Sequence, residues 1–493
     1  MLNRRTLFLK PAFISSMKPI LNLFVLLSLG FSLQAAKPLN IVLILVDDLG
    51  WMDLSCQGSR YYETPNLDRL AAQGMRFTNA YAACAVCSPT RAAVQTGRYP
   101  GRLGVTDWIR SRFQGGAIPA DKKNPSGFTG GKRKFLVPKN ALWMESEEIT
   151  IAEILKPAGY VSCHIGKWHL GADDWYPQKQ GYDFNYGGCD YGQPPNYFDP
   201  FNQPKHRHAM IRAGIPYLPG RKPGQYLSDR EAEEAVAFIE KHKDKPFFLN
   251  MDNYAVHTPI QAKAGVTAKY EKKTKTRQKN AKYAAMVESV DDCAGRIMAA
   301  LEKHGIADRT MIIFTSDNGG LLGPTNNAPL RSGKGYAYEG GIRVPLLIKW
   351  PGVVKHGTTS AEPVTSVDYF PTISEVTGLD LPNDRAIDGL SLAKHLRSQG
   401  KQKLDRDAIY WHFPHYRHNP GPYSIIREGD WKLIKFYEGP MELFDLKNDL
   451  GETKNLAAAM PEKVKVLEDR LLAHLKSVGA KMPKLNPAAK KLN

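Results

Sequence analysis

The sequence NIVLILVDDLG, residues 40–50, joins an uninterrupted apolar run to two adjacent aspartates and a glycine. Such a run is typical of a strand buried on both faces, as in a parallel sheet covered by helices. Four more runs have the same character, at residues 160–165, 247–251, 311–315 and 344–349. Helical patterns lie between them, for example at residues 229–241 and 284–304. The alternation predicts an α/β fold, in which helices flank both faces of a mostly parallel central sheet.

The pattern changes after about residue 398. A Lys/Gln-rich stretch at residues 398–403 predicts a linker, and an amphipathic helix is expected at residues 461–477. Between them, turns at Gly429-Asp430 and Gly439-Pro440 separate short strand-like segments, at residues 408–413, 423–427, 431–437 and 441–445. We expect a main domain at residues 37–398, a smaller α+β subdomain with an antiparallel sheet at residues 399–483, and a disordered basic tail at residues 484–493.

The first 36 residues predict a signal peptide. Basic residues precede an apolar run at residues 20–31, and a small-residue cleavage site follows it. Arg4-Arg5 resembles a twin-arginine signal, whereas translation from Met17 would give a shorter ordinary one, and both readings stay open. The run is too short for a comfortable membrane span. We therefore expect a periplasmic or secreted protein without stable membrane insertion.

Composition narrows the class of protein. The chain has 493 residues, of which 42% are hydrophobic and 24% charged, and this excludes a disordered or collagen-like protein. The net charge of +18 favours a polyanionic partner, although basic loops are usually just solvated surface. No aromatic-interleaved basic motif or zinc-finger spacing supports nucleic-acid binding. Six scattered cysteines are too few for a disulfide framework.

Polar side chains follow four of the predicted strands, at the edge where open α/β sheets bind ligands. They are Asp47, Asp48, Lys167, His169, His257, Asp317 and Asn318. Carboxylate and amide oxygens suit a hard cation, Ca²⁺ or Mg²⁺, rather than zinc. The alternative is that the aspartates are ordinary loop and cap residues. The coincidence of four strand ends favours a site.

Residues 84–97, CAVCSPTRAAVQTG, predict a short helix. Pro89 suits its first turn and Gly97 its end, so that Cys87 lies at the N-terminus, where backbone N–H groups attract anions. Arg91 is four residues further on and can share the face of Cys87. The alternative for Cys84-x-x-Cys87 is a redox pair or half of a zinc site, which the absence of a second such pair disfavours.

These segments resemble the signature blocks of type I sulfatases of the alkaline phosphatase superfamily. Cys87-Ser88-Pro89-Thr90-Arg91 with Thr96-Gly97-Arg98 resembles C-x-P-S-R…T-G-R, with threonine where serine is more usual. The remaining blocks occur in family order, at residues 40–50, 166–171, 257–259, 316–319 and 333–335. The resemblance extends from about residue 37 to the C-terminus and implies an alkaline-phosphatase-like fold and sulfuric ester hydrolysis.

The resemblance also implies a modified nucleophile. Cys87 is expected to be converted to formylglycine (3-oxoalanine) by a formylglycine-generating enzyme before export. The aldehyde hydrates to a gem-diol, in which one hydroxyl attacks sulfur and the other later expels sulfate. Asp47, Asp48, Asp317 and Asn318 would hold the cation, Ca²⁺ in preference to Mg²⁺, with residue 87 as a further ligand.

Roles for the remaining residues follow from the same resemblance. Arg91 would stabilise the diol and the nearby carboxylates. Lys167 and Lys334 would bind sulfate. His169 would be the base that releases sulfate, and His257, with Lys334, the acid that protonates the leaving oxygen. Taken singly, each of these residues is as well explained by a surface loop or a packed core position.

The sequence therefore predicts an exported enzyme that hydrolyses O-sulfate esters of a sulfated carbohydrate. Two alternatives remain: a phosphate or phosphonate monoester hydrolase of the same fold, and a silent glycan-binding protein if Cys87 stays a thiol. Two further groups of residues suit either a substrate pocket or plain loops. They are Trp108, Arg110 and Arg112 in the first part of the chain, and His412, His415, Arg417 and His418 in the last.

Overall fold

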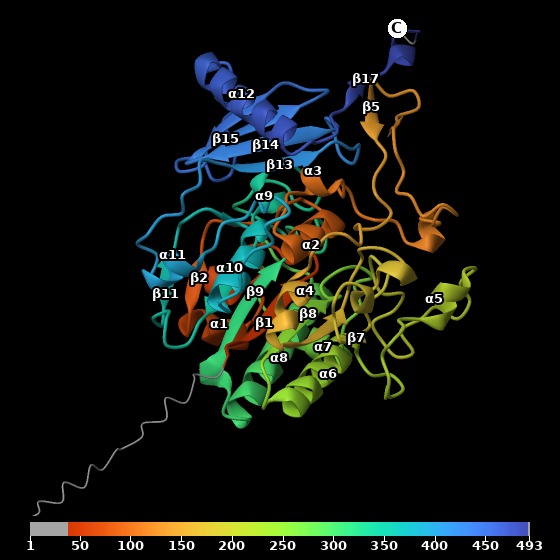
Figure 1. Ribbon diagram of the computed structural model, residues 1–493, viewed down its shortest axis with the longest axis vertical. Coiled ribbons are helices and arrows are strands. Elements are labelled where there is room, and N and C mark those ends of the chain that lie inside the picture. Colours follow the sequence, from red (N-terminus) through yellow and green to blue (C-terminus); the bar gives the residue numbers. More distant parts are fainter. Residues whose placement is uncertain (1–37, 492–493) are drawn as a thin grey trace, which may run out of the picture. The chain divides into compact units, whose positions relative to one another are not determined.

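The computed structural model describes residues 38–491 (Figure 1). The predicted signal peptide, residues 1–36, lies outside the described residues. Within residues 38–491, none of the helices combines the length and the apolar character that crossing a bilayer requires.

An eight-stranded sheet forms the centre of the fold, in the order β11-β2-β10-β9-β1-β8-β6-β7. Its strands are β1 (Asn40–Val46), β2 (Met75–Phe77), β6 (Val161–Gly166), β7 (Phe184–Tyr186), β8 (Phe247–Asn253), β9 (Thr310–Ser316), β10 (Leu346–Lys349) and β11 (Thr358–Ser360). The first predicted strand, β1, lies in the middle and pairs in parallel with β8 and β9. The mostly parallel central sheet is confirmed. A separate pair joins β3 (Ala80–Tyr81) to β12 (Val364–Thr365).

The fifth predicted run corrects the expectation in one respect. β10 is antiparallel to both β9 and β2. A parallel neighbour requires the chain to cross back over the sheet, usually through a helix. After β9 the chain stays at the carboxyl edge through α9 (Glu339–Ile342) and re-enters the sheet from that edge. The apolar composition of the run predicted its burial but carried no information about its direction.

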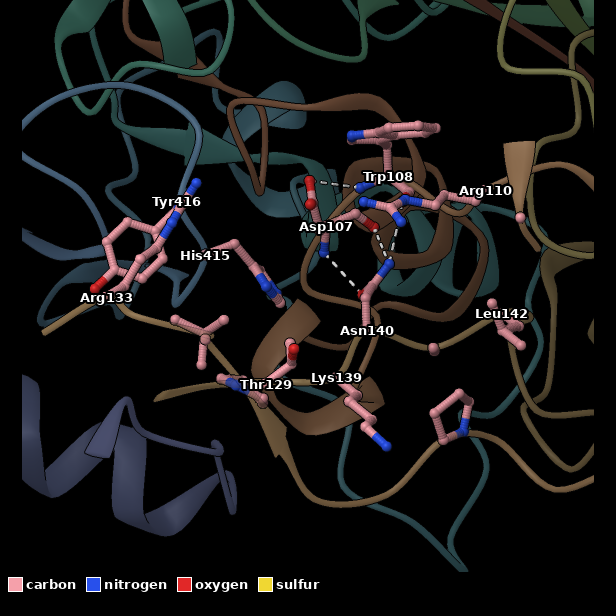
Figure 2. A pocket seen from close by; sticks show the side chains of 16 residues that line it. Asp107, Trp108, Arg110, Thr129, Arg133, Lys139, Asn140, Leu142, His415 and Tyr416 are labelled. Atoms are coloured by element: carbon pink, nitrogen blue, oxygen red, sulfur yellow. Dashed lines mark hydrogen bonds between the residues drawn. The ribbon is translucent and has the colours of Figure 1, made fainter. Parts of the chain in front are cut away.

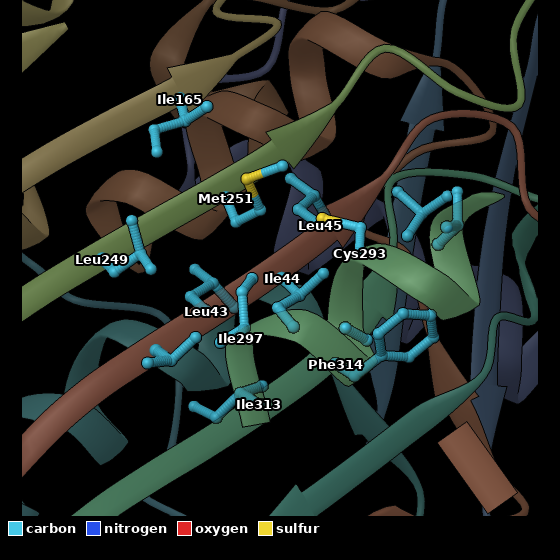
Figure 3. Packing of buried hydrophobic residues seen from close by; sticks show 14 of the residues in the cluster. Leu43, Ile44, Leu45, Ile165, Leu249, Met251, Cys293, Ile297, Ile313 and Phe314 are labelled. Carbon is cyan, nitrogen blue, oxygen red and sulfur yellow. The ribbon is translucent and has the colours of Figure 1, made fainter. Parts of the chain in front are cut away.

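Helices cover both faces of this sheet (Figure 1). The helices of this part of the chain are α1 (Pro65–Ala72), α2 (Cys87–Thr96), α3 (Pro100–Leu103), α4 (Ile151–Leu155), α5 (Ala209–Ala213), α6 (Leu227–His242), α7 (Ala264–Glu271), α8 (Ala281–Lys303), α10 (Tyr369–Val376) and α11 (Ala393–Arg397). Of these, α5 lies away from the sheet and α3 lies next to the C-terminal strand β13 (Ile409–Phe413) (Figure 1). Figure 3 shows Cys293 and Ile297 of α8 beside apolar side chains of β1, β8 and β9. On the other face, Tyr369 of α10 donates a hydrogen bond to Thr315 of β9, 3.3 Å away.

Side chains of β8 alternate between these two helical layers. Phe247 packs edge-on against Phe238 of α6, with ring centroids 5.6 Å apart, and Asn253 donates to Glu231 of α6 at 2.9 Å. Asp252 points the other way and accepts a hydrogen bond from Arg91 of α2 at 3.2 Å. The period of two along a strand thus directs Asp252 towards the helix that begins at Cys87.

The C-terminal part contains the predicted antiparallel sheet. Its strands, in spatial order, are β13 (Ile409–Phe413), β14 (Tyr423–Glu428), β15 (Trp431–Phe436) and β16 (Glu442–Asp445). Helix α12 (Pro461–Ser477) presents Leu467, Leu471 and Leu475, four residues apart, to an apolar cluster with the sheet. The α+β subdomain is confirmed, while its boundary at residue 399 stays a prediction.

The expected disorder of the tail is wrong for the residues described. β17 (Lys484–Leu485) pairs with β5 (Phe135–Pro138), which in turn pairs with β4 (Phe128–Thr129). Asn486 donates to the carbonyl oxygens of Gly131 and Arg133 at 2.9 and 2.8 Å. The unpaired edge of a strand exposes backbone N–H and C=O groups that another segment can hydrogen-bond. β5 has such an edge, and β17 pairs with it. The basic composition of the tail did not indicate this partner.

Candidate active site

Helix α2 places Cys87 at its first residue. Gly97 ends the helix in the left-handed conformation, with φ of 69°. The hydroxyl of Thr90 accepts a hydrogen bond from the backbone N–H of Cys84 at 3.0 Å, and that of Ser88 donates to the carbonyl of His169 at 2.9 Å. The expected helix is confirmed, and these two hydroxyls fix its N-terminus. Cys84 and Cys87 are both buried free thiols.

Arg91 joins the ends of three strands. Its Nε donates to Asp317 after β9 at 2.9 Å, and its Nη1 donates to the carbonyl of Lys167 after β6 at 2.9 Å and to Asp252 of β8 at 3.2 Å. Arg91 Nη2 lies 3.9 Å from Asp47 Oδ1. Burial opposes the charge on Arg91, but the carboxylates of Asp317 and Asp252 outweigh it and raise the pKa of Arg91.

The four predicted oxygen-bearing residues are brought together and fully buried. The backbone N–H of Asp48 donates to Asp317 Oδ1 at 3.2 Å, and Asn318 Nδ2 donates to Asp48 Oδ1 at 2.8 Å. Ligand atoms of Asp47, Asp48 and His257 lie within 4.8 Å of one another. Asp48 has φ of 59°, a conformation that a non-glycine residue keeps only when its surroundings enforce it.

Two lysines oppose this negative charge. Lys167 Nζ lies 2.7 Å from Asp47 Oδ2, and Lys334 Nζ lies 2.6 Å from Asp48 Oδ1. Burial raises the pKa of Asp47 well above its usual range, even though Lys167 acts in the opposite direction. For Asp48, Lys334 and His257 outweigh the effect of burial and lower the pKa.

His169 faces Cys87 with one ring nitrogen and the backbone with the other. Its Nε2 lies 2.7 Å from the carbonyl oxygen of Ile109, which can only accept, so Nε2 carries the hydrogen. Nδ1 is then left as an acceptor, 3.4 Å from Cys87 Sγ. Burial lowers the pKa of His169 well below its usual value, which keeps the ring neutral.

His257 lies on the other side of the site. Its Nδ1 donates to the carbonyl of Thr258 at 3.0 Å, and its Nε2 is 3.6 Å from Asp48 Oδ2. Burial, with the nearby charge of Lys334, lowers the pKa of His257 to about 3. The ring is therefore neutral at pH 7 in the absence of a bound anion.

A cavity of about 210 Å³ opens onto these residues. Cys87, His169, His257 and Lys334 line it, whereas Arg91 and Lys167 are buried among the acidic residues described above. A helix N-terminus, two histidines and a lysine around one small cavity can bind an anion and exchange protons with it.

Two residues of the site escaped the sequence analysis or were left undecided by it. Asp252 was missed because the predicted strand stopped at residue 251, whereas β8 continues to Asn253. Reading two residues further would have added Asp252 to the polar groups at the strand ends. Arg417, one of the residues with two readings, lines the cavity beside Lys334.

Of the other undecided residues, some line cavities and others make structural contacts. Trp108 lines the active-site cavity, and Trp108, Arg110 and His415 line a larger cavity. Arg112 instead pairs with Asp173 at 2.9 Å. His412 is bonded inside the C-terminal sheet, 2.8 Å from the hydroxyl of Ser424, so it is structural.

The donor set also fits a hard divalent cation. Asp47 Oδ1 and Asn318 Oδ1 are buried acceptor atoms without a hydrogen-bond donor among the described residues. Orphaned buried acceptors are costly, and a bound ion relieves that cost. Carboxylate and amide oxygens are the ligands that Ca²⁺ and Mg²⁺ prefer.

Comparisons with known proteins agree with this geometry. The model of the sulfatase family matches residues 39–379, and that of N-sulphoglucosamine sulphohydrolase, C-terminal, matches residues 332–480. The chain is 35% identical to a sulfatase of Formosa agariphila, over 87% of this chain and 86% of that protein. It is 37% identical to human N-acetylgalactosamine-6-sulfatase, over 76% of this chain and 69% of that protein.

A solved structure shows the same fold. Ps i-CgsB in complex with k-i-k-neocarrahexaose superposes with a TM-score of 0.74 at 30% identity, covering 89% of this chain and 93% of that one. Both the family match and the structural likeness span the strand ends that carry the site. The chain belongs to the sulfatase family, the type I sulfatases of the alkaline phosphatase superfamily, and is a sulfuric ester hydrolase.

Proposed function

We propose that this sulfatase hydrolyses O-sulfate esters of a sulfated carbohydrate, with residue 87, oxidised to formylglycine, as its nucleophile. The observation that carries the proposal is the position of Cys87 on a helix N-terminus, next to His169 and in the same cavity as Lys334, which contacts Asp48. The name of the human relative and the ligand of Ps i-CgsB both point to sulfated sugars.

The cation site in this proposal consists of Asp47, Asp48, Asp317 and Asn318, with residue 87 as a further ligand. The two orphaned oxygens, on Asp47 and Asn318, support it. We assign it to Ca²⁺ rather than Mg²⁺, because Ca²⁺ accepts such a mixed set of oxygen ligands in flexible geometry. When bound, the ion supplies positive charge that acidifies a hydroxyl and neutralises sulfate oxygens.

The modified residue supplies two hydroxyl groups on one carbon when its aldehyde is hydrated. The chain's own contribution is to hold residue 87 in place. Ser88 and Thr90 anchor the helix start, and Arg91 fixes the surrounding strand ends. Arg91 also offsets the charge of the buried carboxylates of Asp317 and Asp252.

We assign sulfate binding to Lys334, and to Lys167 the compensation of the negative charge that develops during the reaction. Lys334 lines the cavity beside Cys87, and its ammonium is held charged by Asp48, which raises the pKa of Lys334 despite its burial. Lys167 is completely buried against Asp47. Fixed cations at the place where charge develops are worth more in such a dry site than in water.

His169 is the proposed base. Its protonated Nε2 donates to Ile109, so the free Nδ1 lone pair faces residue 87 and can take a proton from it. The low pKa of His169 ensures that this lone pair is available at neutral pH. A neutral imidazole held by one backbone bond is a suitable proton acceptor.

His257, with Lys334, is the proposed acid that protonates the leaving oxygen. Both line the cavity, and Asp48 contacts both. His257 is neutral in the free site, and the negative charge of a bound sulfate ester raises its pKa towards the protonated form.

The proposal includes an exported enzyme, periplasmic or secreted, and a formylglycine-generating enzyme as its partner before export. The supports are the basic and apolar pattern of residues 1–36 and the segment Cys87-Ser88-Pro89-Thr90-Arg91.

The test compares a sulfate and a phosphate monoester of the same phenol as substrates. We expect turnover of the sulfate ester to exceed that of the phosphate ester by at least about tenfold, because an enzyme discriminates substrates through contacts to the transition state and the family match is to sulfatases. Chelation with EDTA should abolish turnover and Ca²⁺ should restore it. Faster turnover of the phosphate ester would assign the site to a phosphomonoesterase instead.

A further inference from the structure

Two larger cavities adjoin the active-site cavity. A cavity of about 470 Å³ shares Trp108 with it, and a third of about 500 Å³ shares Arg417 with it. The two larger cavities share Arg133 and Tyr416. We call these three adjoining cavities the groove. The 470 Å³ cavity lies between the loop around Trp108, the β4–β5 hairpin and the loop around Tyr416 (Figure 2).

Cations outnumber carboxyl groups along the groove, where Asp107 and Glu438 are the acidic lining residues. Arg110, Arg133, Lys139 and Arg417 are exposed along it, and none of them makes an ion pair within the part of the chain that the structure describes. Arg112, only two residues from Arg110, pairs with both Asp173 and Asp190. Unpaired positive charge concentrated along a concave surface attracts anionic ligands.

Aromatic side chains lie among these cations. The guanidinium of Arg133 is 4.1 Å from the centre of the Tyr416 ring, and that of Arg110 is 5.6 Å from the centre of Trp108. The hydroxyl of Tyr416 accepts a hydrogen bond from the backbone of Phe135 at 3.0 Å, which ties the two walls together. Amphipathic rings and guanidinium groups together suit a ligand with both apolar ring faces and charge.

Hydrogen bonds within the walls of the groove hold the loop around Trp108 in place. Asn140 accepts hydrogen bonds from the backbone of Thr106 and Asp107 at 3.1 and 3.0 Å, and donates to the carbonyl of Trp108 at 3.1 Å. His415, which is buried, contacts the hydroxyl of Thr106 at 2.8 Å. These contacts hold Trp108 at the junction between the groove and the active site.

We propose that this groove binds the sugar units next to the one that carries the reacting sulfate, through further anionic groups of the substrate that contact Arg110, Arg133 or Lys139. The inference rests on the proposed function and specifies its substrate class: an oligosaccharide with at least two anionic groups. The 210 Å³ at the reacting centre is below the roughly 300–1,000 Å³ of typical ligand sites, so the ligand extends beyond it. Arginine binds sulfate or carboxylate oxygens through two parallel hydrogen bonds.

The experiment measures binding and turnover separately. Binding uses the Cys87→Ala protein, which cannot turn over substrate, titrated with tetrasaccharides of chondroitin 6-sulfate and of iota-carrageenan and with a monosulfated monosaccharide. We expect at least one tetrasaccharide to bind about tenfold more tightly than the monosaccharide, and Arg133→Ala to remove that advantage, as loss of a charge-assisted bond would. Lys132→Ala is the matched control, because Lys132 is an exposed cation of the same turn that lines no cavity described above, and it should change nothing.

In enzyme that keeps Cys87 and carries it as formylglycine, turnover of 4-nitrophenyl sulfate should be the same with and without Arg133→Ala, while KM for the tetrasaccharide rises about tenfold at constant kcat. Equal binding of mono- and tetrasaccharides, or equal effects of Arg133→Ala and Lys132→Ala, would overturn the groove as an anion-binding subsite. Failure of the enzyme that carries formylglycine at residue 87 to cleave any sulfate ester would count against the proposed function instead, since the binding comparison stands without it.

Discussion

Burial sets the protonation state of a carboxyl group near the site, that of Glu231. Glu231 of α6 is fully buried and accepts hydrogen bonds from Asn253 Nδ2 at 2.9 Å and from the backbone of Tyr254 at 3.3 Å. Burial raises the pKa of Glu231 to about 8, and the carboxyl group of Asp252 adds to the effect. Below pH 8 the Glu231 carboxyl group is therefore mostly protonated in the folded protein, whereas in the unfolded chain it ionises at its ordinary pKa.

This difference predicts a pH-dependent stability. Between the ordinary pKa of about 4.3 and the raised value the folded state binds more protons than the unfolded state, so stability should fall as pH rises through that window. In the parent protein the free energy of unfolding should fall by on the order of a few kcal/mol between pH 5 and pH 8, and this fall should be absent from the Glu231→Gln variant. Urea unfolding at the two pH values would measure both. If the variant and the parent protein showed the same pH slope, Glu231 would not be the titrating group.

The strand β6 depends on one glycine at its end. Gly166 has φ of 90°, and a Cβ built there would lie 2.0 Å from the carbonyl oxygen of Asp252. That same carbonyl accepts the backbone N–H of Lys167 at 2.7 Å. The close approach of β6 and β8 at this point therefore sets the position of Lys167.

We predict that Gly166→Ala lowers the free energy of unfolding by more than about 2 kcal/mol and reduces turnover, because backbone would have to move. Gly159→Ala is the matched control. Gly159 has φ of 79° but open space around it, so its substitution should cost only the left-handed strain of about 1–2 kcal/mol. Equal costs, measured by urea unfolding, would show that the close contact is unimportant.

The helices and strands that could be predicted from the sequence are those that the local pattern of side chains determines. The apolar runs, the helix at Cys87 and the helix at residues 461–477 all follow from patterns of side chains, and α12 has the predicted bounds. The antiparallel direction of β10 and the pairing of β17 with β5 could not be read in this way, because both depend on where a distant segment lies. Asp252 was missed for a smaller reason, a strand end placed two residues short.

The unexpected strand β17 has a consequence for the groove. Asn486 donates to the carbonyls of Gly131 and Arg133, and its own N–H donates to Lys134. Asn486→Ala should loosen the turn that carries Arg133. We expect KM for a sulfated tetrasaccharide to rise several-fold, with kcat for 4-nitrophenyl sulfate unchanged. An unchanged KM would mean that the turn keeps its shape without Asn486.

On the scale of the whole molecule, a buried charge cluster joins the C-terminal sheet to the segment that carries Lys334. Lys432 of β15 contacts Glu339 of α9 at 2.9 Å and Glu452 at 2.7 Å, and all three side chains are fully buried. Glu452 also accepts the backbone N–H of Glu339 at 2.7 Å. The C-terminal part thus stabilises a loop of the active site and adds Arg417 and Tyr416 to its groove.

Removing one member of such a cluster leaves buried charge unpaired. We predict that Lys432→Met lowers the free energy of unfolding by about 3–5 kcal/mol. Lys465→Met is the control, because Lys465 forms an exposed pair with Asp469 at 3.0 Å that is worth less than about 1 kcal/mol. Chemical denaturation of both variants would decide. Similar losses in the two would contradict a special role for the buried cluster.

The central claim is that residue 87 acts as an aldehyde rather than as a thiol. It is tested most directly by the mass of the tryptic peptide spanning residues 77–91, measured in preparations that differ in specific activity. Conversion lowers that mass by about 18 Da. The account predicts that turnover of 4-nitrophenyl sulfate is proportional to the fraction of peptide with the lower mass. Full turnover in a preparation whose residue 87 is entirely cysteine would contradict it.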